Sequence, residues 1–301
     1  MTTTSPPSPP SPPSPPSPPS APARGRPSRT ARRVLLGLGT LLSLALIAWG
    51  VLWLINLFGR TSEERGSVLA ATGDRLSVVS PGGAIRITGA DVDQIEVRVR
   101  LQYGLKAPRL EQESGPDGIR LSASCPWYGF FCSADYEVRV PTRMSVWAKS
   151  SGGSIAIREV GERVEASSSG GSVRVEDVRG AVQAHSSGGD VRVADADGIV
   201  DLDSSGGDVT GERLRGAEAT AESSGGDVRL DFAAAPRDVR ARSSGGDVEV
   251  LLPRVDGGYR VDADTSGGGR QVDVPTDPDS SRSVRAQSSG GDVTVALTGQ
   301  A

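Results

Sequence analysis

Residues 146–193 read VWAKSSGGSIAIREVGERVEASSSGGSVRVEDVRGAVQAHSSGGDVRV, and the tetrad Ser-Ser-Gly-Gly occurs in them three times at intervals of 18 residues. The tetrad continues toward the C-terminus at intervals of 18 to 23 residues, with threonine replacing the first serine once. The tetrads begin at Ser150, Ser168, Ser186, Ser204, Ser223, Ser243, Thr265 and Ser288. A period near 20 residues is typical of repeat architectures, in which each unit buries its apolar face only by stacking on its neighbours.

Small apolar residues alternate with polar ones on both sides of each tetrad. In the first repeat Val146 and Ala148 precede the tetrad, Ile155 and Ile157 follow it, and most later repeats keep apolar residues at these positions. Alternation with a period of two indicates strands with one buried face. Each repeat is therefore predicted to be two short strands joined by the tetrad. We expect its glycines to supply backbone angles that other residues resist.

Two arrangements of these strands fit the pattern. In a β-solenoid, equivalent strands of successive repeats stack about 4.8 Å apart. In an antiparallel meander, the two strands of one repeat pair with each other. Near-identical residues at each repeat position favour the solenoid, because stacking places like residues on like residues. The predicted fold class is an all-β domain of stacked solenoid-like repeats of 18 to 23 residues, occupying residues 146–301.

An uncharged segment precedes this region: residues 34–59 read VLLGLGTLLSLALIAWGVLWLINLFG. A helix of this length spans roughly 39 Å, more than the ~30 Å of a bilayer's hydrocarbon layer. Five arginines and no acid lie within residues 1–33, so the positive-inside rule places the N-terminus in the cytoplasm and the C-terminal domain outside the cell. We expect a single-pass transmembrane helix in the cell membrane. A cleaved signal peptide is the alternative, although its apolar core is normally shorter.

The N-terminal segment, residues 1–33, is an array of Ser-Pro-Pro units followed by arginines. Proline fixes φ and removes backbone donors, so we expect a disordered, extended polyproline II tail on the cytoplasmic side. Such a segment serves either as a spacer or as a ligand for an aromatic groove.

Residues 60–145 show the repeat pattern in a looser form and are predicted to be a membrane-proximal β region. Alternation indicates strands at 95–101, 118–123 and 136–140. A solenoid needs its open end covered, so we expect these strands to cap the repeats. Residues 66–298 then form one continuous β domain.

This region contains both cysteines of the chain, Cys125 and Cys132. Outside the cytoplasm a disulfide between them is the default expectation. The loop that it closes holds Trp127, Tyr128, Phe130 and Phe131. Two hypotheses remain open for these rings: a contact patch for a glycan, lipid or protein, or a plug for the end of the core.

Three motifs carry a family resemblance. They are the stretch Ser-Pro-Gly-Gly-Ala-Ile-Arg-Ile at residues 80–87, the step Arg-Val-Pro at 139–141, and the recurring Ser-Gly-Gly-Asp-Val. Over about residues 66–298 the chain resembles the bacterial putative-adhesin β-strand-repeat family, a family of unknown function whose domains are also described as toast-rack. The resemblance implies a stacked β fold at the cell surface and supplies no catalytic residues.

Aspartate follows many of the tetrads, forming a candidate calcium column of Asp190, Asp208, Asp227, Asp247 and Asp292. Stacked carboxylates about 5 Å apart repel one another, and calcium relieves such repulsion in some Gly- and Asp-rich repeats. The alternative is structural: each carboxylate accepts local backbone hydrogen bonds. The calcium nonapeptide is absent and three repeats interrupt the column, which favours the structural alternative.

Charge and motif content limit the function. The chain carries a net charge of −4 and its first 33 residues carry +5, so the rest carries −9. Such an acidic surface repels nucleic-acid phosphates. The sequence has no P-loop, zinc, dinucleotide-binding or nucleophile-elbow motif. Its single histidine, His185, is predicted to point outward as a surface residue.

These observations predict a non-enzymatic cell-surface protein, an adhesin or an envelope scaffold, that needs no cofactor. We expect the membrane and either a cell-wall glycan or another surface protein as partners, and no nucleic acid. Two alternatives stay open. An envelope-stress signalling component would use the same anchored layout, and a β-helical carbohydrate-active enzyme would use carboxylates for catalysis.

Overall fold

The computed structural model describes residues 29–58, 61–104, 106–126 and 132–299. Chain contacts divide the protein into two compact units, Met1–Trp53 and Leu54–Ala301. Most of the predicted proline-rich tail, together with Trp127, Tyr128, Phe130 and Phe131, lies outside the described residues.

The first unit contains most of the helix α1, Arg29–Phe58, which covers nearly all of the segment predicted to be helical. Within the part of the chain that the structure describes, no helix reaches the combination of length and apolar content that a bilayer crossing requires. The structure therefore does not support the predicted transmembrane span.

The described residues of the second unit form two sheets of 12 and 11 strands, which we name sheet A and sheet B. The strands of sheet A, in spatial order, are β1 (Thr61–Ala70), β4 (Gln94–Tyr103), β7 (Cys132–Pro141), β3 (Ile85–Ala90), β9 (Ile155–Val160), β11 (Val173–Val178), β13 (Val191–Ala196), β15 (Val209–Leu214), β17 (Val228–Phe232), β19 (Val248–Leu252), β23 (Val293–Leu297) and β21 (Arg270–Asp273). The strands of sheet B, in spatial order, are β20 (Arg260–Thr265), β22 (Ser283–Ser288), β18 (Asp238–Ser243), β16 (Glu218–Ser223), β14 (Val200–Ser204), β12 (Val182–Ser186), β10 (Val164–Ser168), β8 (Ser145–Ser150), β2 (Arg75–Ser80), β6 (Gly118–Ser124) and β5 (Arg109–Gly115).

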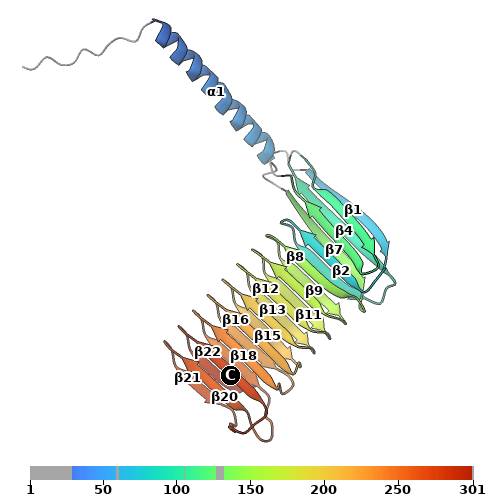
Figure 1. Ribbon diagram of the computed structural model, residues 1–301, viewed down its shortest axis with the longest axis vertical. Helices are drawn as coiled ribbons and strands as arrows, with labels where there is room; N and C mark the ends of the chain where they lie inside the picture. Colours follow the sequence, from blue (N-terminus) through green and yellow to red (C-terminus); the bar gives the residue numbers. More distant parts are fainter. Residues whose placement is uncertain (1–28, 59–60, 105, 127–131, 300–301) are drawn as a thin grey trace, which may run out of the picture. The chain divides into compact units, whose positions relative to one another are not determined.

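Each repeat forms one coil, which consists of a strand of sheet B, a tetrad turn and a strand of sheet A. Equivalent strands of neighbouring coils pair in parallel and in register, so that Val164 lies opposite Val182 and Val173 opposite Val191. Figure 1 shows the strands following one another side by side. The predicted solenoid-like stacking is confirmed, and the meander is excluded because the two strands of a repeat belong to different sheets.

The core lies between the two sheets and is built from the predicted valines and alanines. Val146, Ala148, Ile155 and Ile157 are at most 2% exposed, and their counterparts in most later coils are buried in the same way. Stacking buries each apolar side chain against its own equivalent in the next coil. The sequence alternation thus fixes which face of each strand points inward.

The tetrad turn forms a column of buried hydroxyl groups. The first residue of each tetrad accepts a hydrogen bond from the backbone N–H of the fourth and donates one to a glycine carbonyl in the neighbouring coil. Gly171 N–H donates to Ser168 Oγ at 3.0 Å, and Ser168 Oγ donates to the Gly153 carbonyl at 3.0 Å. These contacts satisfy backbone groups that the turn would otherwise bury without partners.

The expected reason for the tetrad glycines is wrong. None of them has a positive φ. A Cβ at Gly171 would lie 2.4 Å from the Gly153 carbonyl carbon, whereas a Cβ at Gly170 would lie 3.6 Å from its nearest neighbour. The fourth tetrad position therefore requires glycine because the backbones of successive coils approach closely, not because the turn needs a left-handed conformation.

At the C-terminal end the spatial order of coils departs from the order in the chain. The last coil, β22 and β23, lies between the coil of β18 and β19 and the coil of β20 and β21. The chain therefore forms the outermost coil first and then returns to fill the gap. The variant tetrad at Thr265 belongs to this outermost coil, and its hydroxyl still donates to the Gly291 carbonyl at 2.7 Å.

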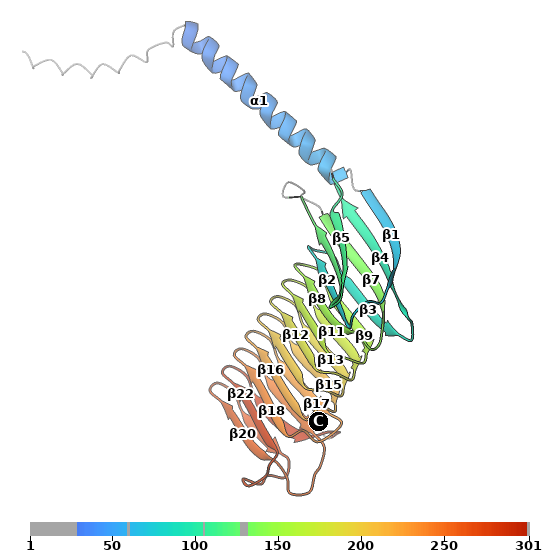
Figure 2. The same ribbon diagram turned by 45° about the vertical axis from the view of Figure 1, so that its right-hand side comes forward.

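The N-terminal end shows a similar departure (Figure 2). The coil of β2 and β3 lies between the coil of β6 and β7 and the coil of β8 and β9. β4 and β1 then extend sheet A by antiparallel pairing, and β5 extends sheet B. The predicted strands at 95–101, 118–123 and 136–140 are confirmed within β4, β6 and β7.

Candidate functional site

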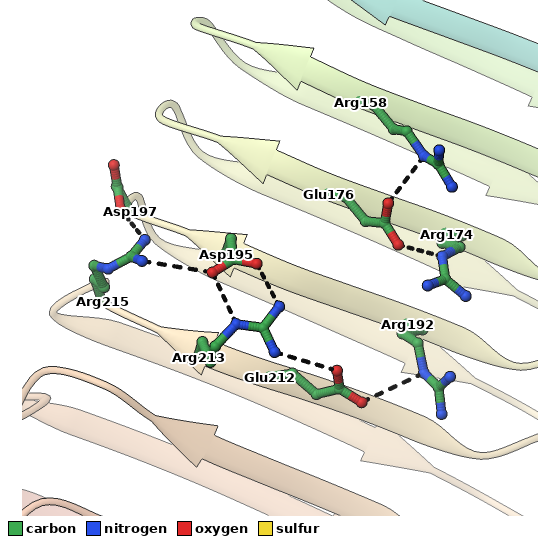
Figure 3. A network of polar contacts seen from close by, with 9 residues as sticks. All are labelled: Arg158, Arg174, Glu176, Arg192, Asp195, Asp197, Glu212, Arg213 and Arg215. Atoms are coloured by element: carbon green, nitrogen blue, oxygen red, sulfur yellow. Dashed lines mark hydrogen bonds and ion pairs between the residues drawn. The ribbon is translucent and has the colours of Figure 1, made fainter.

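The outer face of sheet A carries a network of arginines and carboxylates (Figure 3). Parallel stacking in register makes neighbours of outward-facing residues from successive coils. Arg158 Nε on β9 lies 2.9 Å from the Glu176 carboxylate on β11, which also pairs with Arg174 of its own strand. Glu176 thus bridges two guanidinium groups.

A second group of the network gathers around Asp195. Arg213 of the next coil makes a two-pronged contact with Asp195, and its Nε lies 2.9 Å from Oδ1. Arg215 lies 3.5 Å from Asp195 Oδ1 and 3.0 Å from Asp197 Oδ1. Glu212 joins the group from the other side, 3.8 Å from Arg213 and 3.7 Å from Arg192. Charges of both signs therefore neutralise each other on this face.

The hydrogen bonds from Arg213 hold the pKa of Asp195 below its usual range, and the carboxylate in turn raises the pKa of Arg213. Both side chains are partly open to water. Pairs of this kind contribute about 0–1 kcal/mol each. The network organises the surface of sheet A and leaves these guanidinium groups engaged with protein carboxylates.

Four residues of this face adopt a left-handed backbone conformation at the same position in successive coils. They are Glu159, Asp177, Asp195 and Arg213, with φ between 51° and 59°. At Asp177 the ladder skips one residue, because Glu176 and Val178 have partners in β13 and Asp177 has none there. Non-glycine residues in this region store strain of the order of 1 kcal/mol. The same bend thus recurs in the four successive strands β9, β11, β13 and β15.

In the candidate calcium column, the carboxylates accept backbone hydrogen bonds, which is the structural alternative to binding calcium. Asp190 Oδ1 accepts the backbone N–H of Asp208 at 3.1 Å, and Asp208 Oδ1 accepts that of Asp227 at 2.9 Å. The column continues in the same way through Asp247 and Asp292. Among residues 29–58, 61–104, 106–126 and 132–299, no group of three or more His, Cys, Asp and Glu side chains is placed to hold a metal ion. The carboxylates link one coil to the next.

Cys125 and Cys132 form a disulfide with a Cα–Cα distance of 5.9 Å. The disulfide joins β6 to β7, at the position where other coils have their tetrad turn. The four aromatic residues of this loop lie outside the described residues, so the patch and the plug both stay predictions.

His185 lies on the outer face of sheet B, as predicted. Its Nδ1 lies 2.5 Å from Asp203 Oδ1, and the two residues face each other in the register of β12 and β14. The pair occurs within a row of polar residues from successive coils. Like the pairs on sheet A, this pair joins side chains that parallel stacking places next to each other on adjacent strands.

A hollow of 530 Å³ opens on the N-terminal part of the outer face of sheet B. Register explains its shape: Ser77 on β2 lies between Arg120 on β6 and Trp147 on β8. A small side chain between two large ones leaves a depression about two strand spacings wide, roughly 10 Å. Arg75, Ser145, Val146, Arg163 and Glu165 complete the lining. A second hollow of 510 Å³ adjoins it at Arg75, Ser77 and Arg120 and extends toward the turn between β5 and β6.

Three arginines converge on the hollow: Arg75, Arg120 and Arg163. All three are exposed, and none forms an ion pair with another residue of the described chain. Trp147 is half-buried, and its Nε1 donates to Glu165 Oε1 at 3.0 Å, which fixes the indole ring. This arrangement of free cations around an oriented aromatic ring is the candidate site.

The sequence reasoning missed these residues, although a signal for Trp147 was present. Register places Trp147 in a row across sheet B with Glu113, Arg120, Ser77, Glu165, Gln183, Asp201, Thr220, Arg240, Arg285 and Asp262. Of these described residues Trp147 alone is aromatic, and alternation with Val146 and Ala148 assigns it to the outside. No comparable signal brings Arg120 next to Ser77, because three strands, β3, β4 and β5, separate β2 from β6 in the chain.

The chain is similar to solved structures from three bacteria. A putative cell adhesion protein from Clostridium sporogenes ATCC 15579 is 12% identical, with 79% of this chain and 100% of that chain covered and a TM-score of 0.32. A putative adhesin from Bacteroides fragilis NCTC 9343 is 17% identical, with 79% and 97% covered and a TM-score of 0.45. A putative adhesin from Parabacteroides distasonis ATCC 8503 is 14% identical, with 78% of this chain and 96% of that chain covered and a TM-score of 0.43.

No curated protein matches the sequence. The family model described as Toastrack DUF4097 matches residues 74–298, which include all the coils from β2 to β23. The chain therefore belongs to the toast-rack family.

Proposed function

We propose that this protein is a non-enzymatic surface component of the cell envelope, whose β domain displays a recognition surface for adhesion or scaffolding. The observation that carries the proposal is that polar side chains on both sheets mainly make contacts between coils. Residues that serve as acids and bases in enzymes are here engaged in contacts between coils, as Asp190, Asp208 and Asp195 illustrate. The outward rows and the hollow on sheet B remain available to a partner.

A location outside the cytoplasm is part of the proposal. The disulfide between Cys125 and Cys132 supports it, because disulfides persist mainly in oxidising compartments. A C-terminal epitope tag should be stained by antibody on intact cells. Staining only after permeabilisation would contradict this location.

Binding without turnover tests the proposed activity. We expect the full-length chain, purified in mild detergent, to be retained on cell-wall fractions of the organism that expresses it. The fractions should keep their polymer length and release no soluble fragments during the incubation. Release of fragments in proportion to the amount of protein would indicate an enzyme, and absence of retention would contradict the proposed surface role.

A further inference from the structure

We infer that the hollow between Arg120 and Trp147 on the outer face of sheet B binds an anionic saccharide, a short run of sugar units that carries carboxylate or phosphate groups. This inference rests on the proposed function, for which it names the site and the ligand class. It follows from the aromatic ring, the free cations, the polar lining and the charge of the surrounding surface.

The indole of Trp147 supplies a flat apolar surface within an otherwise polar face. The C–H groups on one side of a pyranose ring pack well against such a surface, while the ring hydroxyls remain free at its rim. The hydrogen bond to Glu165 at 3.0 Å holds the indole in one orientation. A platform that is already oriented loses little conformational entropy when a ligand binds.

The free guanidinium groups supply the preference for an anion. Arg75, Arg120 and Arg163 line the hollow and Glu165 is its one acidic lining residue, so the lining carries a net charge of about +2. Guanidinium groups bind carboxylate and phosphate through paired hydrogen bonds. The arginines of the sheet A network already have carboxylate partners within the protein, whereas these three do not.

The remaining lining favours a hydroxylated ligand over an apolar one. Ser77 lies at the centre of the hollow, and the Ser145 hydroxyl, which donates to the Asp74 carbonyl at 3.0 Å, keeps its oxygen as an acceptor. The hollow has a volume of 530 Å³, within the range of about 300–1,000 Å³ that is usual for small-ligand sites. The adjoining hollow is lined by Glu113 and Asp117 and is not part of the proposed anion site. A short run of sugar units therefore fits better than a lipid chain.

The surroundings of the hollow argue against a nucleic acid. Three strands from Trp147 on the same face, the rows carry Asp201 and Asp203, and then Glu222 before they reach Arg240 and Arg242. A nucleic-acid strand long enough to follow the sheet would meet these carboxylates. A short acidic oligosaccharide held at the hollow would not extend that far.

The test compares two triple variants of the full-length chain. The first replaces Arg75, Arg120 and Arg163 by glutamine. The matched control replaces Arg158, Arg174 and Arg192 on sheet A, which removes the same charge from paired positions. Trp147→Ala and Trp147→Phe complete the set, with the phenylalanine variant retaining an aromatic platform. Melting curves confirm folding before binding is measured.

The probes are oligogalacturonate, a phosphorylated dextran oligosaccharide, neutral dextran of similar length and a short single-stranded DNA. We expect one or both of the first two to bind, with an affinity that falls as salt rises. The hollow triple variant and Trp147→Ala should each lose at least tenfold in affinity, Trp147→Phe less, and the control triple variant less than twofold. The preferred anionic probe identifies the acidic group as carboxylate or phosphate.

Three results would overturn the inference. They are equal losses in the two triple variants, equal binding of dextran and the anionic sugars, and tighter binding of the DNA. Retention of the wild-type chain on cell-wall fractions, with unchanged retention of the hollow variants, would reject this site and keep the proposed function. Absence of wild-type retention would reject both.

Discussion

The tetrad corner and the hollow on sheet B show two opposite uses of a repeated fold. At the corner each coil repeats the last, and every first-position hydroxyl has one donor and one acceptor partner, as at Ser168. At the hollow the sequence departs from the repeat, with Trp147 in a row of polar residues, and the nearby arginines have no partners in the described chain. Positions that repeat hold the coils together, whereas positions that depart from the repeat are free to bind.

The largest change in stability is expected when two glycines of one tetrad are replaced in turn. Gly171→Ala would place a Cβ 2.4 Å from the backbone of the preceding coil, whereas Gly170→Ala would place it 3.6 Å from its nearest neighbour. We expect Gly171→Ala to lower the free energy of unfolding by about 3 kcal/mol or more, since overpacking of this kind forces the backbone to shift. Gly170→Ala should change it by less than about 1 kcal/mol. Equal effects in urea titrations would show that close approach does not govern the corner.

The next test removes the buried hydroxyl of the same tetrad. Ser168 is 1% exposed, so Ser168→Ala leaves the Gly171 N–H and the Gly153 carbonyl without a partner inside the protein. The expected cost is about 1–3 kcal/mol. Ser169→Ala, at the exposed neighbouring position, should change stability by less than about 0.5 kcal/mol. Equal melting temperatures of Ser168→Ala and Ser169→Ala would show that the buried hydroxyl groups do not stabilise the fold.

A smaller effect of opposite sign is expected at the left-handed column. Glu159 has a φ of 59°, which glycine adopts without strain. Glu159→Gly should therefore raise the free energy of unfolding by up to about 1 kcal/mol. Glu137→Gly, in the regular strand β7, should lower it by about 0.5–1 kcal/mol. Destabilisation by both variants to the same extent would mean that the bend at Glu159 carries no strain.

The smallest effect concerns the acid sensitivity of sheet A. The pKa of Asp195 is lowered in the folded state by its hydrogen bonds with Arg213. Its contribution to stability is therefore present above the unfolded value of about 3.9 and is lost as the pH falls through the lower folded value. Asp195→Asn should reduce the drop in melting temperature between pH 6 and pH 2.5. Glu159→Gln serves as the control. An undiminished drop in Asp195→Asn would show that the pair does not stabilise the fold.

The sequence predicted the body of the fold because the repeat contains the register. Val164 lies opposite Val182 only if the strands of successive coils are parallel and in register. The constant spacing of the tetrads predicts this register. The order of coils at the two ends was not predictable from period alone. β22 lies beside β18 although β19, β20 and β21 come between them in the chain, and nothing local in the sequence marks such a return.

The candidate site was only partly accessible from the sequence for a related reason. Alternation assigns Trp147 to the outer face, so an aromatic residue at a position that is otherwise polar gives a readable signal. The hollow itself depends on Ser77 lying between Arg120 and Trp147, which comes from the non-sequential order of β6, β2 and β8. The expected role of the tetrad glycines was wrong because composition does not distinguish a left-handed turn from a close approach of two backbones.

The central claim is that repeated positions build the fold and departures from the repeat bind the ligand. Its most direct test measures the free energy of unfolding and the affinity for anionic saccharide on the same two proteins, Ser168→Ala and the triple glutamine variant at Arg75, Arg120 and Arg163. The claim predicts that the serine variant loses stability and keeps its affinity, while the arginine variant keeps its stability and loses affinity at least tenfold. Loss of both properties in one variant, or unchanged affinity in the arginine variant, would contradict it.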